Sequence, residues 1–297
     1  MHVRTGAGGL HAGGGTVGIL SVVCTFLAMA PARASTEEPA SMELTVVSFN
    51  TAAVPLVDFS VERRVVAIGR ALLDLQADVV ALQEVFPTVD RRRLQRAAKR
   101  AGLAHVAIFD RSYGGSGLMI LSRYPIVTSH FLAYSKNGDP WRLFLGHVDW
   151  FSRKGVGQVR LETPMGPLVV MNTHCVSEHM RGGRDDMVGH RLQQMRELAH
   201  MVCATDRDMP VLVLGDLNAE PGSEELELLL GKTSLRDALP GDLSHIDYVL
   251  SRDGRRHRIG FSTVAWGLEK GRARGGGRTI RLSDHLALVA RVSLKLA

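Results

Sequence analysis

Two kinds of hydrophobic pattern alternate along the chain from about residue 44 onward. The first is a short apolar run bounded by glycine, proline, asparagine or aspartate, which is typical of a strand. We predict strands at 44–49, 79–82, 118–121, 147–151, 156–161, 168–171, 211–214, 246–250, 259–264 and 286–294.

The second pattern repeats apolar residues every three to four positions, as in an amphipathic helix. Within 62–75, the side chains of Val65, Ile68 and Leu72 share one face. Further helices are predicted at 89–101, at 187–203 and at 224–230, the last with Ser223 as its N-cap. The mixed order of strands and helices predicts an α+β fold with two packed mixed β-sheets flanked by helices.

The first 34 residues follow neither pattern. They contain no acidic residue, an apolar run at 17–30, and the small-x-small triplet Ala32-Arg33-Ala34. The run is shorter than the about 20 residues that span a bilayer. We therefore expect a cleaved signal peptide at 1–34, with an uncleaved anchor as the alternative. A polar tail at 35–43 and one catalytic domain at 44–297 would then form a secreted or periplasmic monomer without a transmembrane helix.

Composition narrows the class further. The chain is 45% hydrophobic and 22% charged, which excludes a disordered or collagen-like protein. The net charge is +6, and without Arg4 and Arg33 of the first 34 residues it is +4, which is mildly basic and suits an anionic or phosphate-bearing partner. Cys175 and Cys203 are expected to be buried free thiols, with a disulfide as the alternative. The basic, glycine-rich segment 269–279 is expected to be a solvated loop, with a phosphate-contacting flap as the alternative.

Polar residues follow or begin several of the predicted strands. Taken singly, each has an ordinary explanation as a cap, a turn or a surface residue. Asp247 is harder to explain in this way, because it lies between Ile246 and Tyr248 in an apolar strand and needs a partner such as His285. The full set is Asn50, Glu84, His174, Asp216, Asn218, Asp247, Asp284 and His285.

Together these residues offer what metal-assisted phosphoryl chemistry requires. Carboxylate and amide oxygens bind a hard cation such as Mg²⁺, with Mn²⁺ or another divalent ion as an alternative. One histidine can take a proton from an attacking water if a carboxylate fixes its tautomer. No serine or cysteine nucleophile motif and no zinc-type cluster is present in the sequence. We therefore predict a metal-dependent phosphodiesterase.

The motifs that carry these residues resemble those of the endonuclease/exonuclease/phosphatase superfamily, which has the DNase I-like fold. They occur in the family's order and cover nearly all of 44–297. The pieces are SFNT (48–51), DVVALQEV (78–85), GLMILSRYPI (117–126), NTH (172–174), VLGDLNAEPGS (213–223), HIDYVLS (245–251) and LSDH (282–285). The resemblance implies a four-layer α/β sandwich.

The resemblance also implies a role for each site residue. Glu84 would be the main metal ligand, with Asn50 beside it. His285 would be the general base, oriented by Asp247 or by its neighbour Asp284. His174 would stabilise the transition state. The remaining two residues, which would position the phosphate and the attacking water, are Asp216 and Asn218.

Within the superfamily, the stretch 134–174 is similar to neutral sphingomyelinases, as is the helix with His190, Arg191 and Gln194. Lys154 is then a candidate phosphate contact, and Asp149 a structural or regulatory residue. The leading hypothesis is a sphingomyelinase C-like enzyme that acts at a membrane surface and releases ceramide and phosphocholine.

Two other functions stay open. A secreted DNase-type nuclease would use the same catalytic residues, and basic clusters at 91–93 and 255–256 suit nucleic acid. The aromatic content of only 5% offers few stacking partners for bases. A non-catalytic binding module is the third possibility, and the complete set of polar residues argues against it.

Overall fold

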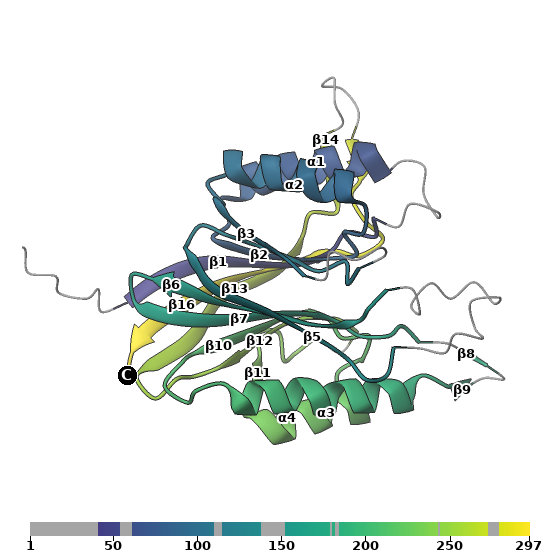
Figure 1. Ribbon diagram of the computed structural model, residues 1–297, viewed down its shortest axis with the longest axis vertical. Helices are drawn as coiled ribbons and strands as arrows, with labels where there is room; N and C mark the ends of the chain where they lie inside the picture. Colours follow the sequence, from purple (N-terminus) through teal and green to yellow (C-terminus); the bar gives the residue numbers. More distant parts are fainter. Residues whose placement is uncertain are drawn as a thin grey trace, which may run out of the picture. The chain divides into compact units, whose positions relative to one another are not determined.

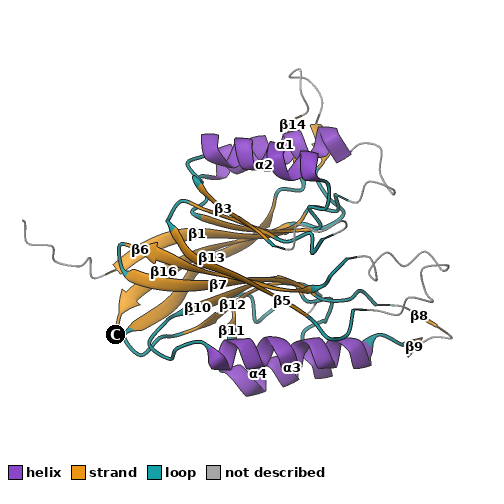
Figure 2. Ribbon diagram, viewed as in Figure 1, coloured by secondary structure: helices purple, strands orange, loops and turns teal. Residues whose placement is uncertain are grey.

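The computed structural model describes residues 41–53, 61–109, 115–137, 152–178, 180–181, 184–242, 244–272 and 279–297. Within these ranges, two six-stranded sheets lie face to face, and a pair of helices covers each outer face (Figures 1 and 2). This is the predicted four-layer α+β sandwich.

The first sheet has the strand order β13-β16-β1-β2-β4-β3. Only β1 and β2 pair in parallel, and the other neighbours are antiparallel. Its strands are β1 (Ser41–Asn50), β2 (Val79–Gln83), β3 (His105–Ile108), β4 (Met119–Ser122), β13 (His257–Gly267) and β16 (Ala287–Leu296).

The second sheet has the order β11-β12-β10-β7-β6-β5, with β7 and β10 parallel. Its strands are β5 (Ile126–Ala133), β6 (Gly155–Thr163), β7 (Gly166–His174), β10 (Val211–Asp216), β11 (Arg236–Asp237) and β12 (Asp247–Arg252). Two small hairpins pair β8 (Met180–Arg181) with β9 (Arg184–Asp185), and β14 (Lys270–Arg272) with β15 (Thr279–Arg281).

Helices α1 (Val61–Leu75) and α2 (Thr88–Arg100) cover the first sheet, and α3 (Val188–Ala204) and α4 (Glu224–Thr233) cover the second. Alternate residues of each central strand point to opposite faces of the sheet and pack in different cores. In β1, Val46 belongs to the core between the sheets, whereas Val47 packs in the core under α1 and α2. Because both faces of the central strands are buried, their sequences are almost continuously apolar.

The structure differs from the sequence prediction at several elements. Strand β1 begins at Ser41, so the last residues of the predicted polar tail are strand. Strands β3 and β5 were not predicted; β5 is partly exposed along its length and forms the edge of its sheet. Segment 269–279 includes β14, which pairs with β15, so the description as a plain loop is wrong.

Three other expectations concern single features. Cys175 and Cys203 are both free, but Cys203 is exposed, because it lies on the outer side of α3. The whole strand predicted at 147–151, the signal peptide at 1–34 and Asp149 lie outside the described residues. Among the described residues, no helix is long and apolar enough to cross a membrane.

Candidate active site

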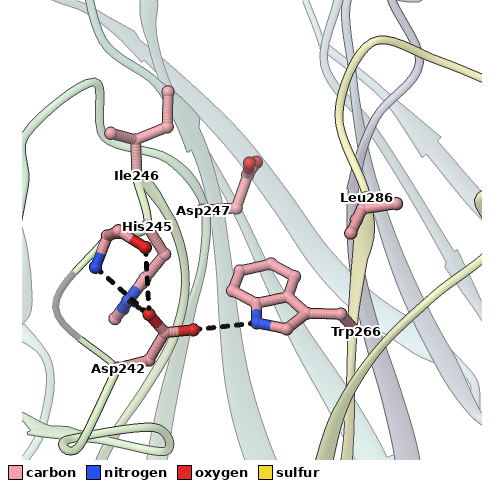
Figure 3. A pocket seen from close by; sticks show the side chains of 7 residues that line it. Asp242, His245, Ile246, Asp247, Trp266 and Leu286 are labelled. Carbon is pink, nitrogen blue, oxygen red and sulfur yellow. Dashed lines mark hydrogen bonds and ion pairs between the residues drawn. The ribbon is translucent and has the colours of Figure 1, made fainter.

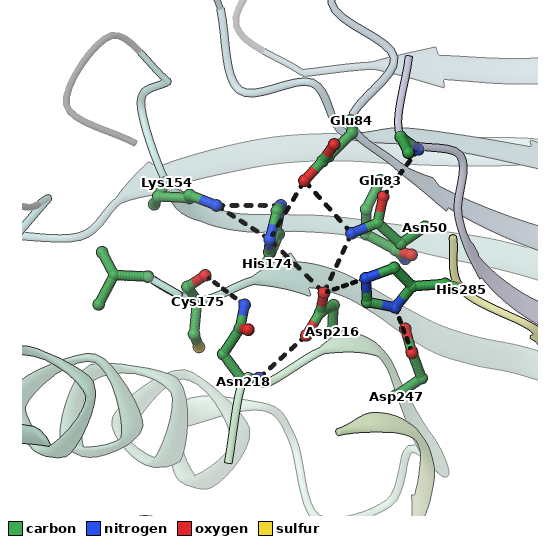
Figure 4. Close-up of polar contacts among 12 residues, drawn as sticks. Asn50, Gln83, Glu84, Lys154, His174, Cys175, Asp216, Asn218, Asp247 and His285 are labelled. Carbon is green, nitrogen blue, oxygen red and sulfur yellow. Dashed lines mark hydrogen bonds and ion pairs between the residues drawn. The ribbon is translucent and has the colours of Figure 1, made fainter. Parts of the chain in front are cut away.

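Three neighbouring strands of the second sheet bring their polar ends together. Asp216, the last residue of β10, is paired with His174 at the end of β7 and with Asp247 at the start of β12. All three residues are at most 4% exposed. This register explains why residues far apart in the sequence meet in one cluster (Figure 4).

Gly215 makes this register possible. A Cβ atom at this position would lie 2.0 Å from the carbonyl oxygen of Thr173 on β7, and the glycine has a φ of +150°. Any other residue would therefore push β7 and β10 apart. The glycine of the Gly-Asp-Leu-Asn sequence thus sets the position of Asp216.

The first sheet contributes the next two residues, from the ends of its parallel strands. The Asn50 Nδ2 atom donates to Asp216 Oδ2 at 3.0 Å and to Glu84 Oε1 at 3.3 Å. Glu84 follows β2 with a left-handed φ of 59°, a conformation that is unfavourable for glutamate. Such backbone strain is frequent at functional sites.

His285 and Asp247 form a short polar contact in this cluster. His285 Nδ1 lies 2.7 Å from Asp247 Oδ2, and His285 Nε2 lies 3.8 Å from Asp216 Oδ2. Ser283 holds the loop in place: its hydroxyl donates to the Asn50 carbonyl at 2.7 Å and accepts the His285 backbone N–H at 3.2 Å. Asp247, a residue in a buried strand, therefore lies in the position that the predicted orienting acid requires.

Asp284 lies apart from this contact. It is exposed and accepts the Ser283 hydroxyl at 3.1 Å instead of a His285 ring nitrogen. Of the two carboxylates predicted to orient the base, it is thus Asp247 and not Asp284 that contacts the His285 ring.

The carboxyl group of Asp216 has an unusual proton affinity. Burial, together with the nearby carboxylate of Asp247, raises its pKa to about 7. The charge of His285 and the hydrogen bond from Asn50 oppose this rise. Ionisation of Asp216 is therefore less favourable here than in water.

His285 responds to the same charges in the opposite sense. Burial would lower its pKa, but the hydrogen bond and charge of Asp247, with further help from Asp216, outweigh burial and raise the pKa to about 9. The imidazolium form is thus strongly favoured. This is the form that results when a histidine takes a proton from water.

His174 lies on the other side of Asp216. Its Nε2 atom is 3.6 Å from Asp216 Oδ2 and 3.9 Å from Glu84 Oε1. Lys154, which is 1% exposed, places its Nζ atom 2.9 Å from the same ring nitrogen. Lys154 therefore joins the predicted site through His174.

Asn218 is held beside Asp216 by its backbone. Its N–H donates to Asp216 Oδ1 at 3.0 Å, and its side chain donates to the Cys175 carbonyl at 3.0 Å. Its φ of 49° turns the chain sharply after β10. Burial raises the pKa of the Cys175 thiol to about 12, so this thiol is no nucleophile at neutral pH.

The residues of this site fit a divalent cation. Ligand atoms of Asp216, Asp247 and His285 lie within 4.8 Å of one another, and Glu84 adds another carboxylate beside Asn50. The Asn50 NH₂ group lies between two carboxylates, where positive charge is favoured. Its Oδ1 accepts the Ala52 N–H at 3.0 Å, so ligation through that oxygen requires the amide to turn over. Carboxylate and amide oxygens suit a hard ion such as Mg²⁺.

Two supporting residues were not predicted from the sequence. The Gln83 side chain of β2 donates to the Asn172 side chain of β7 at 2.7 Å, and Asn172 donates in turn to the carbonyls of Leu82 and Met119. These buried amides connect the two sheets directly behind the site. Both lie inside the motifs noted above, next to Glu84 and close to His174, which is the signal that could have revealed them.

Comparison with known proteins agrees with this arrangement. Residues 47–285 match the Endonuclease/Exonuclease/phosphatase family. Human sphingomyelin phosphodiesterase 2 is 32% identical over 67% of this chain and 46% of its own length. Inositol phosphosphingolipids phospholipase C of Schizosaccharomyces pombe is 30% identical over 66% of this chain and 46% of its own length. The chain thus spans about half the length of the curated relatives that it matches.

A solved structure supports the fold. Sphingomyelinase C from Streptomyces griseocarneus superposes with a TM-score of 0.63 at 23% identity, covering 84% of this chain and 99% of that one. The match to the family extends over most of the chain and includes all the site residues from Asn50 to His285. The chain therefore belongs to the endonuclease/exonuclease/phosphatase family.

Proposed function

We propose that this protein is an exported, Mg²⁺-dependent phosphodiesterase that hydrolyses sphingomyelin to ceramide and phosphocholine. The single observation that carries the chemistry is the His285–Asp247 pair at 2.7 Å, with its free ring nitrogen directed toward Asp216 (Figure 4). The names of the relatives, which include sphingomyelin phosphodiesterase 2, support the choice of lipid.

The pair defines the proton transfer. When His285 is neutral, Asp247 accepts its Nδ1–H, and Nε2 can take a proton from the attacking water. The resulting imidazolium is stabilised by Asp247 and Asp216. Water attacks phosphorus in line, without a covalent enzyme intermediate.

The residues on the opposite side of the site would stabilise the negative charge of the phosphoryl group. His174, with Lys154 at 2.9 Å, presents a cationic and hydrogen-bonding surface to the phosphoryl oxygens. Mg²⁺, when held by Glu84 and Asn50, would neutralise the phosphodiester and polarise its P–O bonds. Asp216 and Asn218 position the water and the phosphate between these two groups.

An assay of the purified protein tests this proposal. Sphingomyelin vesicles and plasmid DNA are each incubated with Mg²⁺, with Mn²⁺ and with EDTA. We expect release of phosphocholine with Mg²⁺ and none with EDTA. Cleavage of DNA but of no lipid would overturn the lipid assignment, and full activity in EDTA would overturn the role of the metal.

Export has a separate test. Residues 1–34 have the features of a signal peptide, so the protein recovered from the medium or periplasm should begin near Ser35. Mass spectrometry of the N-terminal peptide measures this. A product that retains its first 34 residues would contradict cleavage.

The nuclease alternative finds less support. Arg91 is 5% exposed and donates to the Val85 carbonyl at 2.7 Å, and Arg93 pairs with Asp90 and Glu62. Two of the three arginines at 91–93 thus make contacts within the protein itself. A nucleic-acid track needs cations that are available to phosphates.

A further inference from the structure

A pocket of about 320 Å³ lies beside the catalytic pair and shares Asp247 with it (Figure 3). Its walls come from the loop before β12, from β13 and from the residue that follows His285. The lining residues are Asp242, Ser244, His245, Ile246, Asp247, Trp266 and Leu286. None of the reaction steps above uses this space apart from Asp247.

The pocket contains buried polar atoms that have no hydrogen-bond partner among the described residues. His245 is 4% exposed, and both of its ring nitrogens lack a hydrogen bond, as does Asp247 Oδ1. The nearest carboxylate oxygens to His245 are those of Asp237 at 3.3 Å and Asp242 at 3.9 Å. Unpaired buried polar groups are costly, and a ligand or water normally satisfies them.

Trp266 and Asp242 give the pocket its recognition chemistry. The Trp266 indole N–H donates to Asp242 Oδ2 at 2.9 Å, and Asp242 Oδ1 accepts the Ser244 backbone N–H at 3.1 Å. Both carboxylate oxygens are thus occupied, although the negative charge remains. The Asp242 carboxylate would therefore interact with a ligand mainly through its negative charge, and less through additional hydrogen bonds.

The remaining lining suits a cation that is itself partly apolar. Ile246, Leu286 and the Trp266 ring are hydrophobic surfaces, and none of the described lining residues is a lysine or an arginine. A cation against an aromatic ring gains electrostatic attraction, and a quaternary ammonium group has no N–H that needs an acceptor.

We infer that this pocket is the head-group subsite and that it takes the quaternary ammonium group of a choline phospholipid. The inference rests on the proposed function, because the pocket adjoins the His285–Asp247 pair that would act on the phosphodiester. Trp266 provides the aromatic surface, and Asp242 fixes the ring and adds negative charge. His245 forms the adjacent wall, with its ring centroid 5.9 Å from that of Trp266.

Kinetics with matched substrates test the subsite. The values of kcat/KM are measured for sphingomyelin, for inositol phosphoceramide and for bis(p-nitrophenyl) phosphate, which has no lipid head group. In Trp266→Leu, we expect kcat/KM for sphingomyelin, divided by kcat/KM for bis(p-nitrophenyl) phosphate, to fall about tenfold. In Trp266→Phe, this ratio should return most of the way to the wild-type value. Phe261→Leu, an aromatic-to-leucine change on the same strand outside the pocket, is the control.

A binding measurement gives a readout that does not depend on turnover. The indole N–H signal of Trp266, assigned with Trp266→Leu, should shift when phosphocholine is added to the Mg²⁺-loaded protein, and not when inositol 1-phosphate is added. An unmoved signal, or equal effects of Trp266→Leu on all substrates, overturns the subsite. A wild-type protein that binds phosphocholine but hydrolyses no phosphodiester overturns the proposed function and leaves the binding site standing.

Discussion

At the residue scale, His285 lies between two carboxylates that act on it differently. Asp247 fixes one ring nitrogen by a hydrogen bond, and Asp216 lies 3.8 Å from the other. The first contact selects the tautomer, and the second marks the side on which, in the proposed reaction, the histidine would meet the attacking water. Loss of either carboxylate should therefore affect catalysis through a different route.

Asp247→Asn should lower kcat by about 10²- to 10⁴-fold, because the base loses its orientation and its charge partner. The pKa of His285 should fall as well, so the acid limb of the kcat/KM profile should move to lower pH. Steady-state rates across pH measure both effects. Asp253→Asn, which removes a carboxylate paired with Arg236 far from the site, should change the rate less than about twofold. A fully active Asp247→Asn would refute the assignment.

The stability of the metal-free protein should fall as pH rises. Folding raises the pKa of Asp216 from 3.8 to about 7 and that of His285 from 6.5 to about 9. Each raised pKa contributes stability that is present at low pH and is lost as pH passes through the folded value. We therefore expect losses between pH 3.8 and about 7 from Asp216, and between pH 6.5 and about 9 from His285.

Urea unfolding in EDTA at several pH values measures this trend. Relative to Asp216→Asn/His285→Gln, wild type should lose on the order of 3 kcal/mol of unfolding free energy between pH 5 and pH 9.5. Excess Mg²⁺ should reduce the loss, because a cation favours the ionised carboxylate. If the difference in unfolding free energy between the two proteins did not change with pH, the raised pKa values of Asp216 and His285 would be contradicted.

At the element scale, the strands that the sequence predicted best are those buried on both faces. The run 211–214 became β10 (Val211–Asp216), and 79–82 became β2 (Val79–Gln83), because continuous apolar residues are a local signal. The partly exposed edge strand β5 carries polar residues such as His130, so it lacked that signal. Its pairing with β6 is a tertiary effect.

The site shows the same division. Its residues at strand ends were predictable from their order and type, and the structure brings Asn50, Glu84, His174, Asp216 and His285 together. Gln83 and Asn172 lie inside the motifs, but the hydrogen bond between them joins different sheets and depends on how the sheets pack, so the motifs alone do not predict that contact. The pocket of Trp266 is likewise built from segments that meet only in the fold.

Two glycine substitutions should have opposite effects on stability. Gly215→Ala places a Cβ atom 2.0 Å from a backbone oxygen of β7, and should destabilise the protein by more than about 3 kcal/mol. Gly231→Ala, in α4 where a Cβ atom meets nothing within 4 Å, should stabilise it by roughly 0.5–1 kcal/mol. Chemical denaturation measures both. Equal effects would mean that the close approach of β7 and β10 is not required.

At the scale of the whole molecule, buried amides hold the two sheets together behind the site. Asn172→Ala removes three hydrogen bonds that connect β7 to the first sheet, and should cost about 2–5 kcal/mol of unfolding free energy. Asn137→Ala removes one hydrogen bond, to the Tyr134 carbonyl, and should cost about 1 kcal/mol. Equal losses in the two variants would show that the link between the sheets adds nothing.

The pairing of β1 with β16 has a consequence for protein synthesis. Ser41 lies opposite Lys295, so the first described strand receives one of its two neighbours only when the last strand has been made. Until then one edge of β1 has no neighbouring strand. In a nascent chain such an edge can pair with the wrong strand or be bound by a chaperone. His285 is also made only just before that strand. The ribosome thus completes the fold and the proposed catalytic base almost together, so a chain that stalls before residue 285 has neither.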